Sequence, residues 1–441
     1  MSDDLPRRLS FFDASTIVVG SMIGSGIFLK ASGIAQKLAD PWIILVVWAV
    51  SGALTLFGAL AMAELGAMYP RAGGLYVYLH DAYGPFVAFL FGWCLLAILQ
   101  TGSIAGLAVG VTRAIAAQVT VSPDVEPIIS VFLIVLFSAV NLMSVRTGAG
   151  LQNFFTVCKT VGILLLIAGG VFLARGSLAN LTAHATPTVE MSTVSAFGAC
   201  MLAALWAYDG WINVTFMAGE VQEPQRNLPR ALAAGTLFVI GVYVATNAAY
   251  HFVLPVEAIG QAKNVSREVA AAFLGASGAV VMTIIVMLSS SGTLNSSVMT
   301  GPRVYYAMAK DGLFFPSVAA VHERFLTPHV AIIVQAVWSM LLLIRWKTFD
   351  ALTDNVVFIF WIFYALGAGA VIIMRRRFPD AERPYKTPGY PFVPIIFILG
   401  ALFLIINTIV VSTQESREAV YLLIIGAVLY PFFRSRYVAR Q

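Results

Sequence analysis

Charged residues are scarce in this chain of 441 residues, and their scarcity excludes most soluble proteins. Asp, Glu, Lys and Arg make up 11% of the sequence, whereas hydrophobic residues make up 59%. A soluble domain carries about 25% charged and about 45–50% apolar residues. The composition therefore excludes a water-soluble enzyme and indicates one body embedded in a lipid bilayer. The net charge of +5 is spread between apolar runs rather than gathered in a patch, so we expect no nucleic-acid partner.

Cysteine and histidine are also sparse. The three cysteines, Cys94, Cys158 and Cys200, lie within apolar runs without a CxxC motif, which argues against a disulfide framework and a metal site. The five histidines fall in loops or at the ends of apolar runs, and no HExxH motif occurs. An intramembrane enzyme would need paired carboxylates, a Ser–His pair or a metal cluster within its spans. We therefore expect neither enzymatic activity nor a cofactor.

Long apolar runs make up most of the sequence. A helix needs about 20 apolar residues to cross a bilayer core of about 30 Å. By that measure the sequence predicts an all-α polytopic membrane protein with twelve transmembrane helices. The expected spans lie near 14–38, 42–66, 86–117, 127–145, 150–174, 194–218, 230–253, 273–308, 329–344, 351–374, 392–411 and 419–433.

The distribution of basic residues predicts the orientation of these spans. An even number of spans places both termini on the same side. With a cytoplasmic N-terminus, 17 Lys and Arg residues fall in inner segments and 9 in outer segments. Because Lys and Arg accumulate in cytoplasmic loops, we expect a multi-pass protein of the cell membrane with both termini in the cytoplasm.

Two spans contain interruptions. The first includes Gly20-Ser-Met-Ile-Gly-Ser-Gly-Ile-Phe28, and the sixth includes Trp206-Ala-Tyr-Asp-Gly-Trp211. Such interruptions are tolerated at membrane depth only where the backbone lines a cavity or is buried in protein. The two interrupted spans are the first members of two successive sets of five spans. Because five is odd, the second set crosses the membrane with inverted topology. Broken helices at corresponding positions of inverted repeats indicate the binding site of a transporter.

These repeats define the expected domain organisation. The transport core covers residues 13–374, with repeat one at about 13–174 and repeat two at about 194–374. Two additional helices follow at 391–433. The cytoplasmic tails are residues 1–12 and 434–441.

The chemistry of the two breaks predicts an α-amino acid as ligand. An unwound Gly24-Ser25-Gly26 leaves backbone N–H groups at the start of the second half-helix, which suits a carboxylate. The break at Asp209 exposes carbonyl groups and the negative end of a half-helix, which suits an ammonium. Trp206 and Trp211 are candidates to cover the bound side chain, and packing is the alternative role for each.

Ionisable residues within the spans need a reason, because each is costly if unpaired. Lys159 lies ~15 Å into span five, where it acts as a fixed cation or as a proton site. Asp209 has three candidate partners: the substrate amine, Lys159 or nearby N–H groups. Glu64, near the inner end of span two, is interpreted as structural. Span eight carries a polar face that includes Ser289, Ser290 and Asn295.

Several motifs together resemble a known family. Gly20–Phe28, Ala63-Glu-Leu and Pro70-Arg-Ala-Gly-Gly-Leu-Tyr76 resemble the amino acid–polyamine–organocation superfamily. Gly219-Glu-Val-Gln-Glu-Pro-Gln-Arg-Asn-Leu-Pro229 and Asn153-Phe-Phe-Thr-Val-Cys-Lys-Thr160 are similar to its L-type amino acid transporter branch. The resemblance covers nearly the whole chain. It implies a twelve-helix carrier with a five-plus-five inverted-repeat core that works by alternating access around broken helices 1 and 6.

The resemblance also implies roles for individual residues. Lys159 matches a lysine that stands where related symporters bind sodium, which implies transport without sodium. Trp206 matches an aromatic residue that gates the site. The substrate-binding positions implied are Met22, Gly24, Ser25, Gly26, Trp206, Ala207 and Asp209.

Two departures from the L-type pattern bear on substrate and partner. A second glycine usually stands where this chain has Asp209, so a preference for large neutral side chains does not transfer, and an acidic group favours polar or cationic substrates or ties the helix down. Residues 118–127 lack the cysteine that joins eukaryotic members to a heavy chain, so no disulfide-linked heavy chain is expected. The leading hypothesis is a sodium-independent exchanger of neutral L-amino acids. The alternatives are a proton-coupled symporter and, more remotely, an intramembrane enzyme or a channel.

Overall fold

The computed structural model of the chain describes residues 5–116, 118–119, 121–189, 191–346, 356–411 and 413–438. Within these ranges there are helices and no strands, with one isolated bridge between Leu9 and Val221. The α-helices are α1 (Phe11–Met22), α2 (Gly26–Leu38), α3 (Pro41–Met68), α4 (Leu75–Tyr83), α5 (Pro85–Cys94), α6 (Gln100–Ala116), α7 (Glu126–Met143), α8 (Val145–Phe172), α9 (Thr193–Tyr208), α10 (Asn213–Phe216), α11 (Pro224–Val253), α12 (Val256–Gln261), α13 (Val265–Leu274), α14 (Ala276–Thr300), α15 (Pro302–Lys310), α16 (His329–Trp346), α18 (Val356–Arg377), α19 (Phe392–Val411) and α20 (Thr413–Val438).

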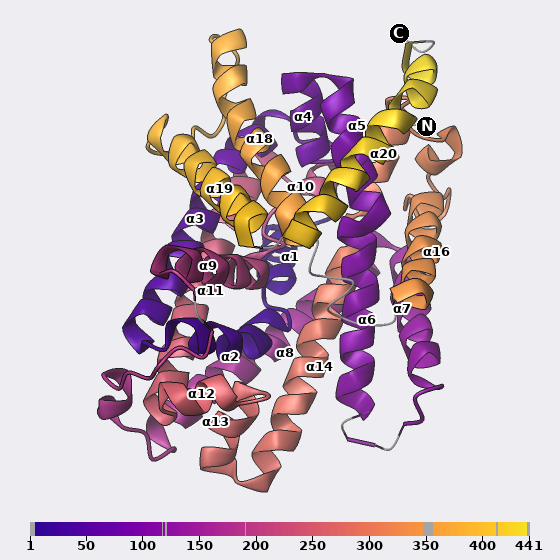
Figure 1. Ribbon diagram of the computed structural model, residues 1–441. Coiled ribbons are helices and arrows are strands. Elements are labelled where there is room, and N and C mark those ends of the chain that lie inside the picture. The colour runs from indigo at the N-terminus through magenta and orange to yellow at the C-terminus, as the bar shows by residue number, and fades with distance from the viewer. Residues whose placement is uncertain are drawn as a thin grey trace.

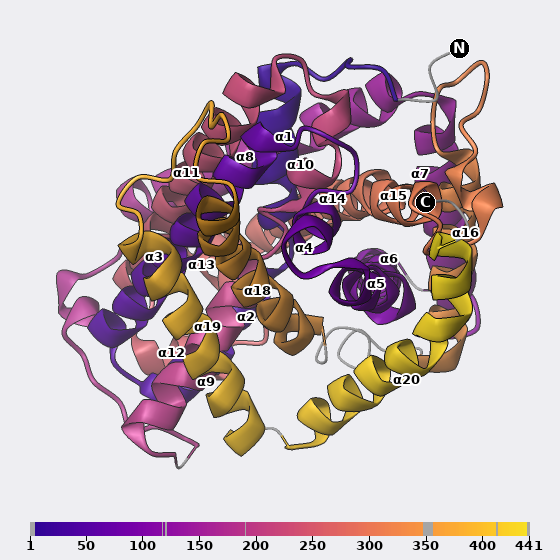
Figure 2. The same cartoon turned by 90° about the horizontal axis from the view of Figure 1, so that it is seen from above.

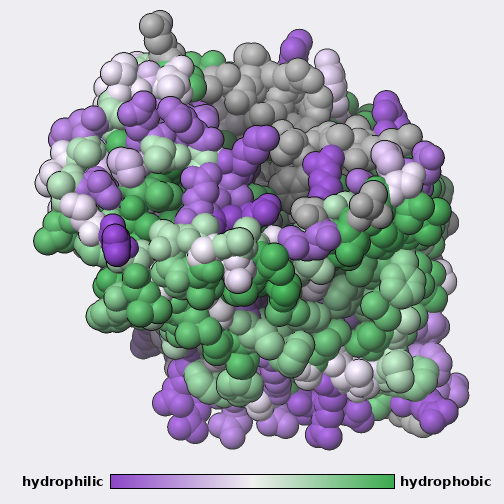
Figure 3. Space-filling view, turned by 90° about the horizontal axis from the view of Figure 1, so that it is seen from below, coloured by the Kyte–Doolittle hydropathy of each residue, from purple (hydrophilic) through white to green (hydrophobic). Residues whose placement is uncertain are grey.

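The helices confirm the expected polytopic architecture. Nine helical stretches among the described residues are long and apolar enough to cross a membrane, and three shorter apolar helices complete the set of twelve. The shorter ones are Thr193–Tyr208, His329–Arg345 and Val420–Arg434. The first residues of the tenth expected span, 351–355, and the last residues of the expected C-terminal tail, 439–441, lie outside the described ranges. On the face in Figure 3, hydrophobic residues form a broad band with hydrophilic residues along its margins.

Local sequence signals explain where the first helices begin. Ser10 caps α1 through a reciprocal pair of bonds with Asp13, whose backbone N–H donates to the serine hydroxyl over 3.2 Å. Asp40 caps α3 by accepting from the N–H groups of Trp42 and Ile43, with Pro41 in the first turn. Each cap satisfies N–H groups that a helix start otherwise leaves without an acceptor.

Spans one and six are broken as expected. The first span consists of α1 and α2, which are separated at residues 23–25, and the sixth consists of α9 and the short α10. The first half-helix, α1, packs against α8, α11 and α14 and lies near the middle of the molecule in Figure 1. Helices α18 and α19 pack beside one another and against α3, as Figures 1 and 2 both show. The broken segments are therefore enclosed by helices from both halves of the chain.

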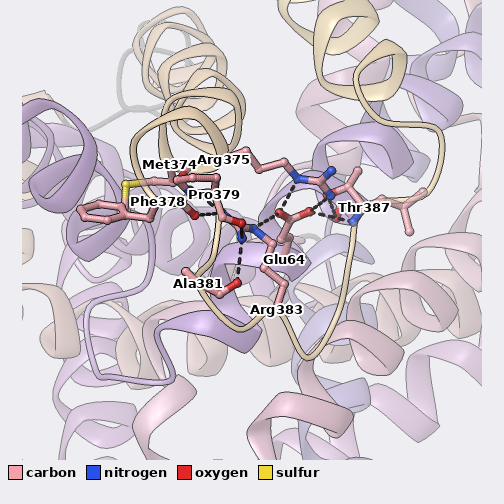
Figure 4. A network of polar contacts seen from close by, with 9 residues as sticks. Glu64, Met374, Arg375, Phe378, Pro379, Ala381, Arg383 and Thr387 are labelled. Atoms are coloured by element: carbon pink, nitrogen blue, oxygen red, sulfur yellow. Dashed lines mark hydrogen bonds and ion pairs between the residues drawn. The ribbon is translucent and has the colours of Figure 1, made fainter.

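A buried ionic cluster joins α3 to the end of α18. Glu64 is 1% exposed and accepts hydrogen bonds from Arg375 at 2.7 and 2.6 Å, from both nitrogens of one side of the guanidinium (Figure 4). The N–H of Thr387 donates to the same carboxylate over 2.7 Å, and the Arg383 Nε lies 3.4 Å away. Arg383 also donates to carbonyl groups at the end of α18. The structural role expected for Glu64 is what the structure shows.

We expect Glu64→Ala to destabilise the protein strongly, because it leaves two arginines of this cluster without their carboxylate. Breaking a buried ion pair by removing one partner costs about 3–5 kcal/mol. Glu223→Ala is the matched control, since its pair with Arg226 is exposed and such pairs contribute about 0–1 kcal/mol. Thermal unfolding in detergent measures both variants. Equal midpoints for the two would contradict the structural weight given to Glu64.

Candidate functional site

The break in the first span leaves hydrogen-bond donors without acceptors. The helix α1 ends at Met22, whose carbonyl accepts from the N–H of Gly24 over 2.8 Å. The N–H groups of Ser25, Gly26 and Ile27 find no backbone acceptor in the described part of the chain. There, the buried hydroxyl of Ser25 also has no hydrogen-bond partner. Because these groups stand at the positive end of α2, they form a cradle for an anion.

The break in the sixth span brings a second helix end to the same place. The helix α9 ends at Tyr208, and Gly210 follows with a φ of 94°. A Cβ on Gly210 would lie 2.8 Å from the Cβ of Ser21, and one on Gly26 would lie 2.7 Å from Ala207. Only glycine fits a left-handed backbone at such a close approach. The two broken spans therefore touch each other directly.

A pocket lies between the two breaks. All seven substrate-binding positions implied by the sequence line it: Met22, Gly24, Ser25, Gly26, Trp206, Ala207 and Asp209. The remaining walls come from Ser21, Gly210 and Asn213 of the broken spans, and from α6, α14 and α18. The residues from those three helices are Gln100, Ser103, Leu107, Thr293, Ser297 and Phe360.

Most of the residues on these other walls were not predicted from the sequence. Gln100 follows a π-helical turn, Leu95–Leu99, that interrupts the third span. No sequence pattern predicted this turn. Such turns occur frequently at functional sites. The polar run from Gln100 to Ser103 inside an apolar span was the available signal for this wall.

Lys159 is fully buried and bonds to the backbone of the first break. Its ammonium donates to the carbonyls of Gly20 and Ile23, each over 2.6 Å, and to that of Ser289 over 3.3 Å. Thr293 lies 3.5 Å away. The side chain therefore connects α8 with the end of α1 and with α14. Its hydrogen bonds go to carbonyl and hydroxyl groups, and Asp209 is not among these acceptors.

Asp209 has a partner that the sequence did not suggest. The hydroxyl of Tyr364, on α18, donates to its carboxylate over 2.8 Å. Tyr364 is 1% exposed and is held by Trp211 and Phe360, whose rings lie 5.3 Å from its own. Asp209 itself is half-buried and faces the pocket. A carboxylate thus borders the pocket with one oxygen bound to a neutral donor.

The polar residues expected on span eight divide between two environments. Ser289 donates to the carbonyls of Ile23 and Gly24, at 3.0 and 3.1 Å. Asn295 instead donates to Gly148 and Gln152 on α8. Ser290 is buried, and none of the three residues lines the pocket. Of the three, Ser289 is the one that contacts the first break.

The two tryptophans flanking the second break also differ. Trp206 lines the pocket, and the ammonium of Lys30 lies 4.7 Å from its ring centroid, within the range of a cation–π interaction. Trp211 is 1% exposed and packs against Tyr364 and Phe397. Packing is therefore the role of Trp211 in this structure.

Comparisons with known proteins agree with this architecture. The profile of the amino acid permease family matches residues 9–430. The chain is 31% identical over 435 residues to the serine/threonine exchanger SteT of Bacillus subtilis (strain 168), covering 98% of both chains. It is 31% identical over 435 residues to the human b(0,+)-type amino acid transporter 1, covering 97% of this chain and 88% of the relative. It is 29% identical to the human cystine/glutamate transporter over 406 residues, covering 91% and 80%.

The chain belongs to the amino acid permease family. It is a multi-pass membrane protein of a class that transports amino acids, and it is not an enzyme. The resemblance drawn from the motifs is confirmed.

We expect Gly26→Ala to impair amino acid uptake about tenfold or more. The new methyl group would lie 2.7 Å from the backbone and side chain of Ala207, and overpacking of this kind costs about 1–3 kcal/mol. Gly33→Ala on the same helix is the matched control, because its Cβ would meet nothing within 4 Å. Uptake and thermal unfolding are measured for both variants. Normal uptake by Gly26→Ala would show that the contact between the breaks is unimportant.

Proposed function

We propose that the protein is a sodium-independent exchanger of neutral L-amino acids that works by alternating access around the two broken spans. The observation that carries the proposal is the position of Lys159. Its ammonium lies among the carbonyl oxygens of Gly20, Ile23 and Ser289. Carbonyl oxygens are the ligands that a sodium ion would need at a break in a helix. A permanent positive charge there holds α1, α8 and α14 together without an ion.

The two breaks supply the groups that an α-amino acid requires. In this proposal the substrate carboxylate binds the N–H groups at Ser25 and Gly26, and its ammonium binds the carbonyl end of α9 near Ala207. Trp206 covers the side chain, and Asp209 adds negative charge beside the ammonium. The open donors of Ser25 and the pocket between the breaks support this arrangement.

The walls of the pocket favour a small polar side chain. Gln100, Ser103, Asn213, Thr293 and Ser297 all contribute polar groups. The similarity to a serine/threonine exchanger supports the same choice. Serine and threonine are therefore the first substrates to test.

The same proposal includes topology and partners. Expected inner segments meet on one side, where Arg377 donates to the carbonyl of Asp81 over 3.2 Å. Expected outer segments also contact one another, since the N–H of Ala185 donates to the carbonyl of Ala39 over 3.0 Å. Contacts between segments assigned to the same side support the proposed orientation. The proposal also includes repeats at 13–174 and 194–374, additional helices at 391–433 and cytoplasmic tails at 1–12 and 434–441. The protein functions in the cell membrane without a disulfide-linked heavy chain.

Sodium-free proteoliposomes test the exchange mechanism. We expect labelled L-serine to enter vesicles preloaded with unlabelled serine and threonine, and to enter empty vesicles far more slowly, with or without an inward proton gradient. Accumulation in empty vesicles driven by the gradient would instead establish the second candidate, a proton-coupled symporter. The burial of Lys159 favours that candidate, because a buried lysine can exchange a proton.

Lys159→Met separates these mechanisms. The substitution leaves the carbonyls of Gly20 and Ile23 without their donor, and each lost bond in a buried site costs about 1–3 kcal/mol. We expect exchange to slow about tenfold or more, whereas Lys37→Met on α2 leaves it unchanged. For a symporter the proton-driven component disappears in the variant. Unchanged rates and unchanged coupling would show that Lys159 has neither role.

Asp209 raises the separate question of cationic substrates. Its carboxylate borders the pocket and is bound by a neutral hydroxyl. If Asp209 binds a cationic side chain, L-lysine competes with L-serine for uptake by the wild type. Asp209→Asn then weakens the binding of lysine about tenfold more than the binding of serine, because a charge-assisted hydrogen bond is lost. Asp81→Asn, at a carboxylate that does not line the pocket, is the control. An equal loss for both amino acids would mean that Asp209 contacts the α-ammonium of the substrate or only stabilises the broken helix.

A further inference from the structure

Tyr243 connects the two broken spans from a third helix. It lies on α11, is 0% exposed, and its hydroxyl is 2.7 Å from the carbonyl oxygen of Met22 and 3.0 Å from that of Ala207. Met22 is the last residue of α1, and Ala207 belongs to the last turn of α9. One hydroxyl thus meets the ends of both half-helices that border the pocket.

The ring of Tyr243 is held in place by its neighbours. The ring of Trp48 lies 5.6 Å away in an edge contact, and the ring of Tyr208 lies 4.8 Å away. Aromatic pairs at these distances stabilise a fixed orientation. Because the ring is fixed, the position of the hydroxyl is fixed as well, and both helix ends contact it through their carbonyl groups.

We propose that Tyr243 is a positioning residue that sets the spacing between the carboxylate cradle of the first break and the ammonium cradle of the second. The inference rests on the proposed function. The cradle at Ser25 and Gly26 follows Met22 closely in the chain, and the expected ammonium ligands lie at the end of α9 with Ala207. The single hydroxyl proton is shared between the two carbonyls, which keeps both of them close to one oxygen and fixes the distance between the two cradles.

A fixed spacing has a specific consequence for substrate choice. An α-amino acid separates its carboxylate from its ammonium by one carbon, and a β-amino acid adds one C–C bond, about 1.5 Å. A rigid pair of cradles accepts the first and rejects the second. A loosened pair loses part of that discrimination, whereas a general loss of stability would weaken both substrates alike.

Tyr243→Phe removes the hydroxyl and retains the ring. The matched control is Tyr208→Phe, which removes another buried hydroxyl of the same aromatic cluster, one that donates to the carbonyl of Trp48 over 3.2 Å. For each variant, inhibition of labelled serine exchange by L-alanine and by β-alanine is measured in proteoliposomes. We expect the ratio of the two inhibition constants to fall about fivefold to tenfold in Tyr243→Phe, the equivalent of one buried hydrogen bond. In Tyr208→Phe it stays within about twofold.

The possible failures are distinguishable. A wild-type protein that exchanges no L-amino acid contradicts the proposed function, whereas normal exchange with an unchanged ratio in Tyr243→Phe overturns the role of Tyr243. If Tyr243→Phe does not fold, 4-methylphenylalanine at position 243 fills the volume of the hydroxyl without donating, and 4-aminophenylalanine restores a donor. A lower ratio with the methyl group than with the amino group is then expected, and equal ratios overturn the inference.

Discussion

The hydrogen bonds of Lys159 to the carbonyls of the first break meet a demand that the membrane places on every broken helix. Away from water, an unpaired backbone group costs several kcal/mol. The carbonyls of Gly20 and Ile23 accept hydrogen bonds from the ammonium of Lys159, and the carbonyl of Met22 accepts one from the hydroxyl of Tyr243. The N–H groups of Ser25, Gly26 and Ile27 receive no backbone acceptor in the part of the chain described. The protein thus supplies donors for the acceptors of the break and leaves donors open, which is the arrangement a carboxylate ligand requires.

The contact between the two breaks depends on small residues. Gly26 lies against Ala207, and Gly210 lies against Ser21, at distances where any added methyl group would collide. Close approach brings the positive end of α2 and the negative end of α9 to one pocket. Since the dipole effect falls off within a turn of the helix end, two cradles of opposite polarity can serve one small zwitterion only when the helix ends are this close.

The sequence allowed the breaks and their own residues to be predicted, because glycine-rich and charged interruptions stand out in apolar spans. All seven positions implied for substrate binding line one pocket. Tyr243 and Tyr364 were not predicted because a single polar residue on an unbroken helix gives no indication of the carbonyl or carboxylate that it will contact. Such contacts depend on tertiary packing between segments distant in sequence. Asn295 shows the converse, since its position on a polar face did not reveal that it bonds to α8 rather than lining the pocket.

The helix α18 links the pocket to the ionic cluster at its other end. Phe360 lines the pocket and Tyr364 holds Asp209, whereas Arg375 binds Glu64 of α3. A movement that separated α18 from α3 would have to break this ion pair between Arg375 and Glu64. A movement that kept them together would break none of these bonds. The ion pair therefore favours displacement of α18 together with α3, whereas the first break is tied to α14 through Lys159 and Ser289.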